Sequence, residues 1–146
     1  MKILFITHVN EKNLVPNDII NDCVLHGLKE VYGNTNVVDY PGSWHMYKDE
    51  VDKRNFSYSN FWGNGFTYYD NLKNYENVDR EDIERKVKNN FFDYIIYGSI
   101  TRSQLYFDSA INSKSKRWVQ IKKVRSIVKN TITNARYPNH MNIVAL

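Results

Sequence analysis

The first forty-one residues carry a strand–helix–strand pattern, which constrains the fold more than any other feature of the chain. Residues 2–7 form a short apolar run, as expected of a buried strand in a parallel sheet. Apolar residues then recur at helical spacing over residues 17–31, and Gly33 suits a left-handed C-cap. A second short strand is expected at residues 36–40, ended by Pro41. Because parallel strands need a crossover, this pattern predicts a βαβ unit with a right-handed connection.

The predicted helix should turn one apolar face toward the core. The residues expected on that face are Ile19, Ile20, Cys23, Val24, Gly27, Leu28 and Val31. Cys23 is the only cysteine, so an internal disulfide and a cysteine-based metal site are both excluded. A single thiol on an apolar helix face indicates an inert, buried side chain in a reducing compartment, and we expect a cytoplasmic protein.

Alternating helices and strands continue toward the C-terminus. The expected elements are a helix beginning at Asp79 as N-cap, a strand at 91–99, helices from about Ser103 and from about 115 to 130, and a last strand at 142–146. We therefore predict an α/β fold in a single domain, residues 1–146. It should be a Rossmann-like three-layer arrangement around a parallel sheet of about four strands. A chain of 146 residues is long enough to bury such a core.

A long aromatic-rich insertion, residues 42–77, interrupts this alternation. Its aromatic side chains are Trp44, Tyr47, Phe56, Tyr58, Phe61, Trp62, Phe66, Tyr68, Tyr69 and Tyr75. No strand or helix period persists, so we predict an ordered loop with little regular structure. Such rings can stack on sugar faces, or they can simply pack a long loop onto the sheet. The sequence favours neither alternative.

The charge of the chain is uneven. Residues 109–146 contain eight basic and no acidic residues, although the whole chain carries a net charge of only +4. A basic helical segment at about 113–130 is a candidate surface for anionic membrane lipids, with a solvated outer face as the alternative. Nucleic acid is the less expected partner because aromatic residues are sparse there. No apolar stretch approaches the ~20 residues that cross a bilayer, and no signal-peptide pattern is present.

Candidate site residues follow the strands, because open α/β sheets bind ligands beyond the carboxyl ends of their strands. They are Thr7, His8 and Asn10 after the first strand, Asp39 and Tyr40 at the end of the second, and Gly98, Ser99, Thr101 and Arg102 after the third. His8 is the candidate general base; alternatively it caps a helix or bonds a neighbouring loop. The segment 98–102 offers amides and a guanidinium to an anion, or forms a strand-to-helix turn.

Asp39 occupies the position of the acidic residue that binds ribose in dinucleotide folds. The loop after the first strand contains no glycine, however, so the phosphate cradle of such folds is missing. Asp39 is therefore better explained as a tether for a loop. The four histidines are scattered without metal-ligand spacing, and we predict no metal site and no bound cofactor.

Residues 1–8 resemble the opening of GT-B glycosyltransferases. The stretches 17–41 and 79–100 also resemble the N-terminal half of bacterial and viral glycosyltransferase-like proteins, and the resemblance covers roughly residues 1–105. It implies the acceptor-side domain of a sugar transferase that uses a nucleotide sugar, with His8 where a base would stand. The expected ligand is a sugar or nucleotide sugar, and the expected role is in polysaccharide biosynthesis. Because a last strand at 142–146 supplies no following loop, the chain is expected to be a fragment or a natural short form.

The alternative function is a non-catalytic Rossmann-like module. In that case the aromatic insertion or the basic segment would recognise a partner, an anionic surface or a nucleotide. Whether the chain is an enzyme by itself depends on donor contacts that a single acceptor-side domain lacks.

Overall fold

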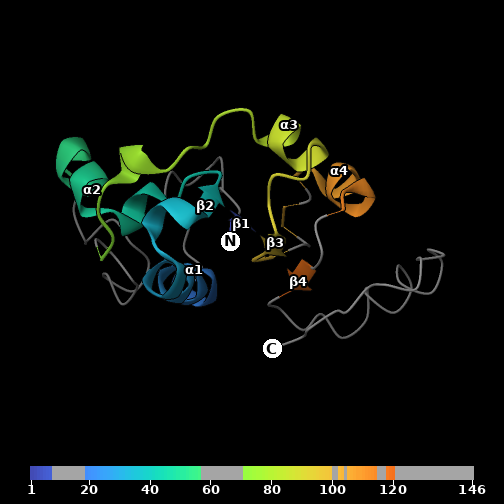
Figure 1. The fold of residues 1–146 in the computed structure, drawn as a ribbon. Coiled ribbons are helices and arrows are strands. Elements are labelled where there is room, and N and C mark those ends of the chain that lie inside the picture. The colour runs from blue at the N-terminus through green and yellow to red at the C-terminus, as the bar shows by residue number, and fades with distance from the viewer. Residues whose placement is uncertain (8–18, 57–70, 100–101, 104, 115–117, 121–146) are drawn as a thin grey trace.

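A parallel sheet with helices on both faces forms the centre of the protein (Figure 1). This computed structural model describes residues 1–7, 19–56, 71–99, 102–103, 105–114 and 118–120. The strands in these residues are β1 (Ile3–Ile6), β2 (Val37–Tyr40), β3 (Tyr94–Tyr97) and β4 (Trp118–Gln120). They pair in parallel in the order β2-β1-β3-β4. The prediction of a mixed α/β chain built on a small parallel sheet is confirmed.

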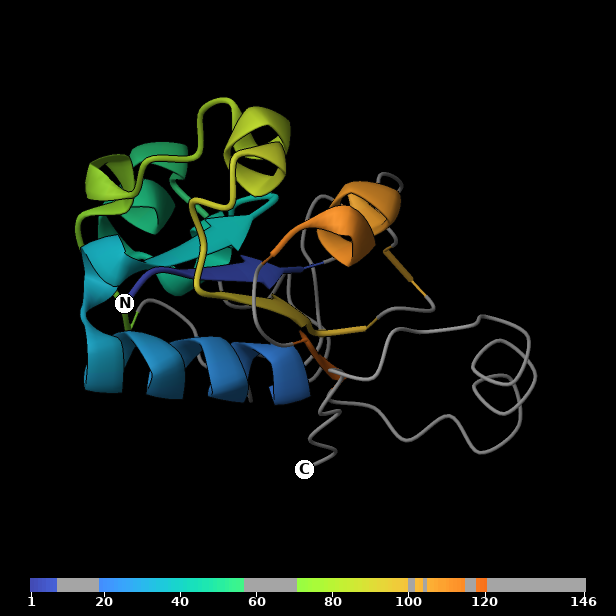
Figure 2. The ribbon, with the colours of Figure 1, turned by 45° about the vertical axis from the view of Figure 1, so that its right-hand side comes forward.

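The described helices divide between the two faces of the sheet. They are α1 (Ile19–Tyr32), α2 (Lys48–Arg54), α3 (Ile83–Lys88) and α4 (Phe107–Asn112). Figure 2 shows α1 along one face and α3 with α4 across the other. Short 3₁₀ turns, η1 (Asn34–Asn36), η2 (Trp44–Met46) and η4 (Tyr75–Asn77), join the elements. The central strand β1 is completely buried, which explains why its sequence is a continuous apolar run.

The buried face of α1 differs from the predicted one. Ile19, Ile20 and Val31 are exposed, and Val31 reaches 73%. The side chains that point inward are instead Asn21, Asp22, Leu25 and Lys29. Buried polar contacts account for this face, since Lys29 pairs with Asp39 of β2 and Asp22 contacts the buried His45. The apolar spacing thus located the helix correctly but predicted the wrong residues for most of its buried face. Of the residues expected there, Val24 and Leu28 pack at the border of the core, and Cys23 is half-buried.

The described parts of the predicted insertion, 42–56 and 71–77, contain regular structure, so the prediction of an irregular loop is wrong there. Helix α2 has Asp49 and Glu50 in its first turn and basic residues in its last turn, as favours the helix dipole. Asn55 ends it in a left-handed conformation. Tyr47 and Leu72 form a parallel bridge, with Leu72 N donating to Met46 O at 2.7 Å. Residues 57–70 lie outside the described residues.

The aromatic rings of this segment that the structure describes pack against protein. Trp44 contacts Phe56 edge-on, with ring centroids 5.1 Å apart. Tyr47 contacts Tyr75 in the same way at 5.0 Å. Tyr47 is completely buried and joins the main core. These four rings therefore serve packing; the other rings of the segment lie at positions that the structure does not describe.

Further elements differ from the predictions in their bounds or their type. Helix α3 begins at Ile83 instead of Asp79, because Asp79 closes a turn by accepting a hydrogen bond from the Glu81 amide. The third strand begins at Tyr94. Residues 118–120 form β4, although the sequence predicted a helix there, since pairing with β3 outweighs local helix preference. The rest of that basic segment and the predicted strand at 142–146 fall outside the described residues.

Candidate functional site

The carboxyl ends of β1, β2 and β3 meet at one edge of the sheet. The Thr7 amide donates to the Tyr40 carbonyl at 2.8 Å, and the Gly98 amide donates to the Ile6 carbonyl at 3.0 Å. The Thr7 hydroxyl donates to the Pro41 carbonyl at 2.6 Å. The structure thus brings together Thr7, Tyr40 and Gly98, three of the residues predicted from sequence. The Thr7 side chain is buried and ties two strand ends to each other.

A tight turn follows β3. The Ser99 carbonyl accepts hydrogen bonds from the amides of Arg102 and Ser103, both at 3.0 Å. Ser99 is buried, whereas Arg102 is exposed to solvent. The first described helix after this turn, α4, begins only at Phe107. The turn therefore holds Arg102 on the surface beside the carboxyl edge. The predicted site residues His8, Asn10 and Thr101 lie outside the described residues.

Gly98 lies directly against the first turn of α1. A Cβ atom at this position would stand 2.6 Å from Asn21 Oδ1 and 2.7 Å from Asn21 Cγ. Asn21 is itself buried, so its amide has little space to move aside. The glycine is required for the close approach of α1 to the end of β3, which is a packing role at the edge of the sheet.

A Gly98→Ala variant should be destabilised by about 1–3 kcal/mol, the usual cost of overpacking a buried contact. Shortening the neighbour with Asn21→Ala should recover part of that loss in the double variant, because it removes the atoms that the new methyl group meets. Urea unfolding of the four proteins in this cycle measures the coupling. Additive effects of the two substitutions would contradict the proposed close contact.

Tyr40 connects the end of β2 to the start of α4. Its hydroxyl accepts a hydrogen bond from the Tyr106 hydroxyl at 3.2 Å, and the two ring centroids are 5.7 Å apart. The bond to Tyr40, together with burial and the negative charge of Glu84, raises the pKa of Tyr106 to about 12. Tyr40 is thus partly engaged in holding α4 over the sheet, and the Tyr106 phenol remains protonated at neutral pH.

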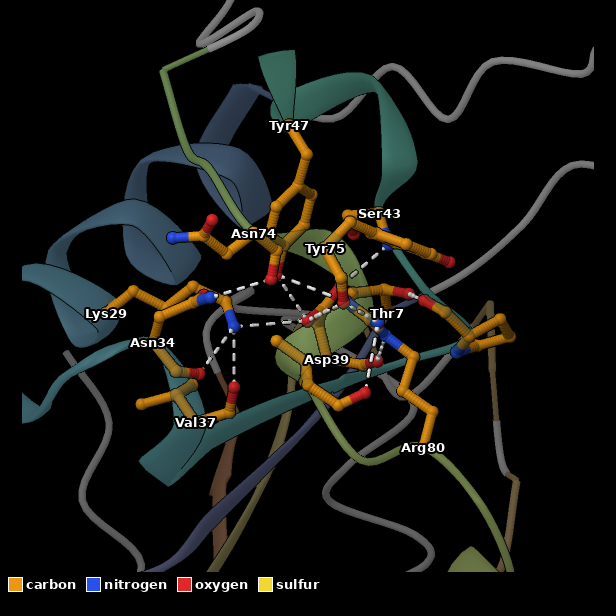
Figure 3. A network of polar contacts seen from close by, with 12 residues as sticks. Thr7, Lys29, Asn34, Val37, Asp39, Ser43, Tyr47, Asn74, Tyr75 and Arg80 are labelled. Atoms are coloured by element: carbon orange, nitrogen blue, oxygen red, sulfur yellow. Dashed lines mark hydrogen bonds and ion pairs between the residues drawn. The ribbon is translucent and has the colours of Figure 1, made fainter. Parts of the chain in front are cut away.

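Asp39 is the centre of a buried polar cluster (Figure 3). Its carboxylate lies 3.2 Å from the Lys29 ammonium and 2.9 Å from the Arg80 guanidinium. It also accepts hydrogen bonds from the Tyr47 hydroxyl at 2.8 Å and the Ser43 amide at 2.7 Å. We call Asp39, Lys29, Arg80, Tyr47 and Ser43 the Asp39 cluster.

The Asp39 cluster joins three separate stretches of chain. Lys29 comes from α1 and also donates to the Val37 carbonyl at 2.6 Å. Arg80 precedes α3, donates to the Asp39 carbonyl at 3.0 Å, and lies over the Tyr75 ring. Because the Asp39 side chain is fully buried and its oxygens are occupied by protein donors, it ties α1 and the segment after β2 to the sheet.

The ionisation of Asp39 is set by these neighbours. Burial by itself would raise the pKa of this carboxyl, but the charges of Lys29 and Arg80 act in the opposite direction and outweigh it. Hydrogen bonds from Ser43 and Tyr47 add to their effect. The net result holds the pKa of Asp39 below its usual range, so the group is an anion at neutral pH.

A second buried polar contact lies between α1 and η2. His45 Nε2 is 3.2 Å from Asp22 Oδ2, and both side chains are buried. The sequence did not single out Asp22, His45, Lys29 or Arg80, and it pointed to Tyr47 only as one of the aromatic rings of the insertion. One signal was present, since Asp22, Leu25 and Lys29 recur at i, i+3 and i+7 and therefore share one helix face. The partners of Asp22 and Lys29 come from distant positions and could not be identified from spacing.

Within the part of the chain that the structure describes, no three His, Cys, Asp or Glu side chains come together in a way that could hold a metal ion. None of the described helices combines the length and the apolar character that crossing a bilayer requires. Comparisons with protein-family models, curated proteins and solved structures found no match to this chain. The geometry of the carboxyl edge is therefore the basis for any functional proposal.

Proposed function

We propose that this chain is a Rossmann-like domain that binds a phosphate-bearing small molecule, such as a nucleotide or nucleotide sugar, at the carboxyl edge between β1 and β3. The carrying observation is the strand order β2-β1-β3-β4. The chain leaves β1 toward β2 on one side and returns to β3 on the other. Ligands of doubly wound sheets bind where the strand order reverses in this way.

Two charge features support an anionic ligand at this edge. The exposed Arg102 guanidinium follows β3 and suits bidentate contact with phosphate oxygens. The first turn of α1 lies against Gly98, so the positive end of the helix dipole is close to the same strand end.

Within this class, the more specific proposal is the acceptor-side half of a glycosyltransferase. The sequence resemblance supports it, and the reaction would transfer a sugar from its nucleotide to an acceptor hydroxyl. His8 is the proposed base that removes the hydroxyl proton, and Arg102 would offset phosphate charge. A non-catalytic nucleotide-binding module is the alternative. Release of nucleotide from a nucleotide sugar by the isolated chain would favour the transferase, whereas binding without turnover would favour the module.

The binding proposal is tested with uridine diphosphate as the probe. We expect the wild-type chain to bind it in isothermal titration calorimetry and the Arg102→Ala variant to bind it at least about tenfold more weakly, since hydrogen bonds to charged groups contribute about 1.5–3 kcal/mol. Arg85→Ala is the matched control, because Arg85 is also exposed but lies on α3 beside Asp82. Absence of binding by the wild type, or equal losses in both variants, would contradict the proposal.

A further inference from the structure

A cavity between α3 and α4 lies outside the carboxyl-edge site. Its volume is about 310 Å³, at the lower end of the range for small-ligand pockets. The described residues that line it are Glu84, Tyr106, Phe107, Asp108 and Ser109. It is formed by the two helices that cover the sheet face opposite α1 (Figure 2). We call it the α3–α4 pocket.

The described lining of the α3–α4 pocket is negatively charged. Glu84 and Asp108 contribute carboxylates, and no basic side chain belongs to the described lining. The Lys88 ammonium, one helical turn after Glu84, lies 2.6 Å from one oxygen of the Glu84 carboxylate. That pair is solvent-exposed, and such pairs are weak. Among the described residues, no ion pair engages the Asp108 carboxylate. A ligand for this pocket should therefore carry positive charge.

Two aromatic residues, Tyr106 and Phe107, also belong to the described lining, together with Ser109, and protein contacts hold the two rings in place. The Tyr106 hydroxyl is bonded to Tyr40. The Phe107 ring packs edge-on against Tyr97 with centroids 5.9 Å apart. Ring faces attract ammonium and guanidinium groups. Burial is the main cause of the raised pKa of Tyr97, and the charge of Asp108 adds to it. For the raised pKa of Tyr106, the bond to Tyr40 is the main cause, and the charge of Glu84 is the smallest.

We propose that the α3–α4 pocket binds an organic cation, specifically an ammonium group carried on a small ring or alkyl body. A bare Ca²⁺ or Mg²⁺ ion fits less well, because these ions require six or more oxygen ligands and the described lining offers mainly two carboxylates and two aromatic rings. This ligand is of opposite charge to the one proposed for the carboxyl edge. The pocket is therefore a second site that the nucleotide proposal does not require.

Glucosamine and glucose form a suitable pair of probes, because they differ by the ammonium group. In ¹H–¹⁵N correlation spectra, we expect glucosamine to shift the amide signals of residues 105–109 and glucose to leave them unchanged. The response should weaken with added salt. The double variant Glu84→Gln/Asp108→Asn should bind glucosamine at least about fivefold more weakly, given the modest strength of exposed ion pairs.

Glu81→Gln is the matched control, since this carboxylate is exposed just before α3 and does not line the pocket. Both substituted carboxylates are exposed, so the double variant should keep its fold, which the same spectra report. Equal shifts with glucose, a double variant that binds as well as wild type, or an equal loss in the control would overturn the proposal. The Arg102→Ala variant should respond to glucosamine like wild type, which separates this site from the carboxyl edge.

Discussion

Replacing Asp39 with asparagine is expected to lower the free energy of unfolding by about 3–5 kcal/mol, the usual result of breaking a buried ion pair. The amide keeps the shape of the side chain but removes the negative charge. Lys29 would then be a buried cation without a counter-charge, and Arg80 would lose its carboxylate partner. Since small domains are stable by only about 5–15 kcal/mol, this is a large fraction of the total. Urea unfolding followed by circular dichroism measures it.

An exposed ion pair provides the control for this variant. Asp52→Asn breaks a surface pair with Lys48 on α2 and should change stability by less than about 1 kcal/mol. Adding Lys29→Met to Asp39→Asn should recover part of the loss, because it removes the buried cation. If Asp39→Asn were as mild as Asp52→Asn, the Asp39 cluster would not be a stabilising feature of the fold.

The same variant has a pH signature. The folded-state pKa of Asp39 lies below its ordinary value, because burial is outweighed by Lys29 and Arg80. Its contribution is therefore fully present above the unfolded pKa of about 4 and is lost as the pH falls through the folded value. The stability difference between wild type and Asp39→Asn should narrow below about pH 4. A constant difference down to pH 2 would contradict this assignment.

The second large effect is expected at Phe92, whose side chain is 1% exposed in the main core. Phe92→Ala should lower the free energy of unfolding by about 3–5 kcal/mol, through lost burial and the cavity left behind. Phe91 provides a neighbouring comparison. It is 47% exposed and touches Phe92 edge-on, so Phe91→Ala should cost no more than about 1.5 kcal/mol.

Denaturant unfolding of both phenylalanine variants tests the register of this segment directly. The sequence places both rings in one predicted strand, whereas the structure starts β3 at Tyr94 and separates the two rings by burial. Similar losses in the two variants, or a larger loss at Phe91, would show that the chain enters β3 with a different orientation.

Much of the sheet could be predicted because β1 and β3 are short apolar runs and β2 is apolar except for Asp39. The predicted strands at 2–7, 36–40 and 91–99 contain β1, β2 and β3, and the helix between the first two is α1. Complete burial leaves a continuous apolar signature that needs no knowledge of partners. For the candidate site, the sequence predicted only that it lies after the ends of the strands. In the structure, Gly98 permits close packing of α1 against β3, and Asp39 forms the centre of a buried polar cluster.

What the sequence alone determined was the alternation of elements that leads to an α/β fold with a parallel sheet. The spacing of apolar residues and the turn residues are local signals, so helices and strands can be predicted from them in the sequence alone. Only the tertiary structure decided which face of α1 is buried, that α2 forms within 42–77, and that residues 118–120 join the sheet as β4. These outcomes depend on charges and strand partners far away along the chain. Lys29 is buried because it forms an ion pair with Asp39, and no local sequence pattern predicts that pair.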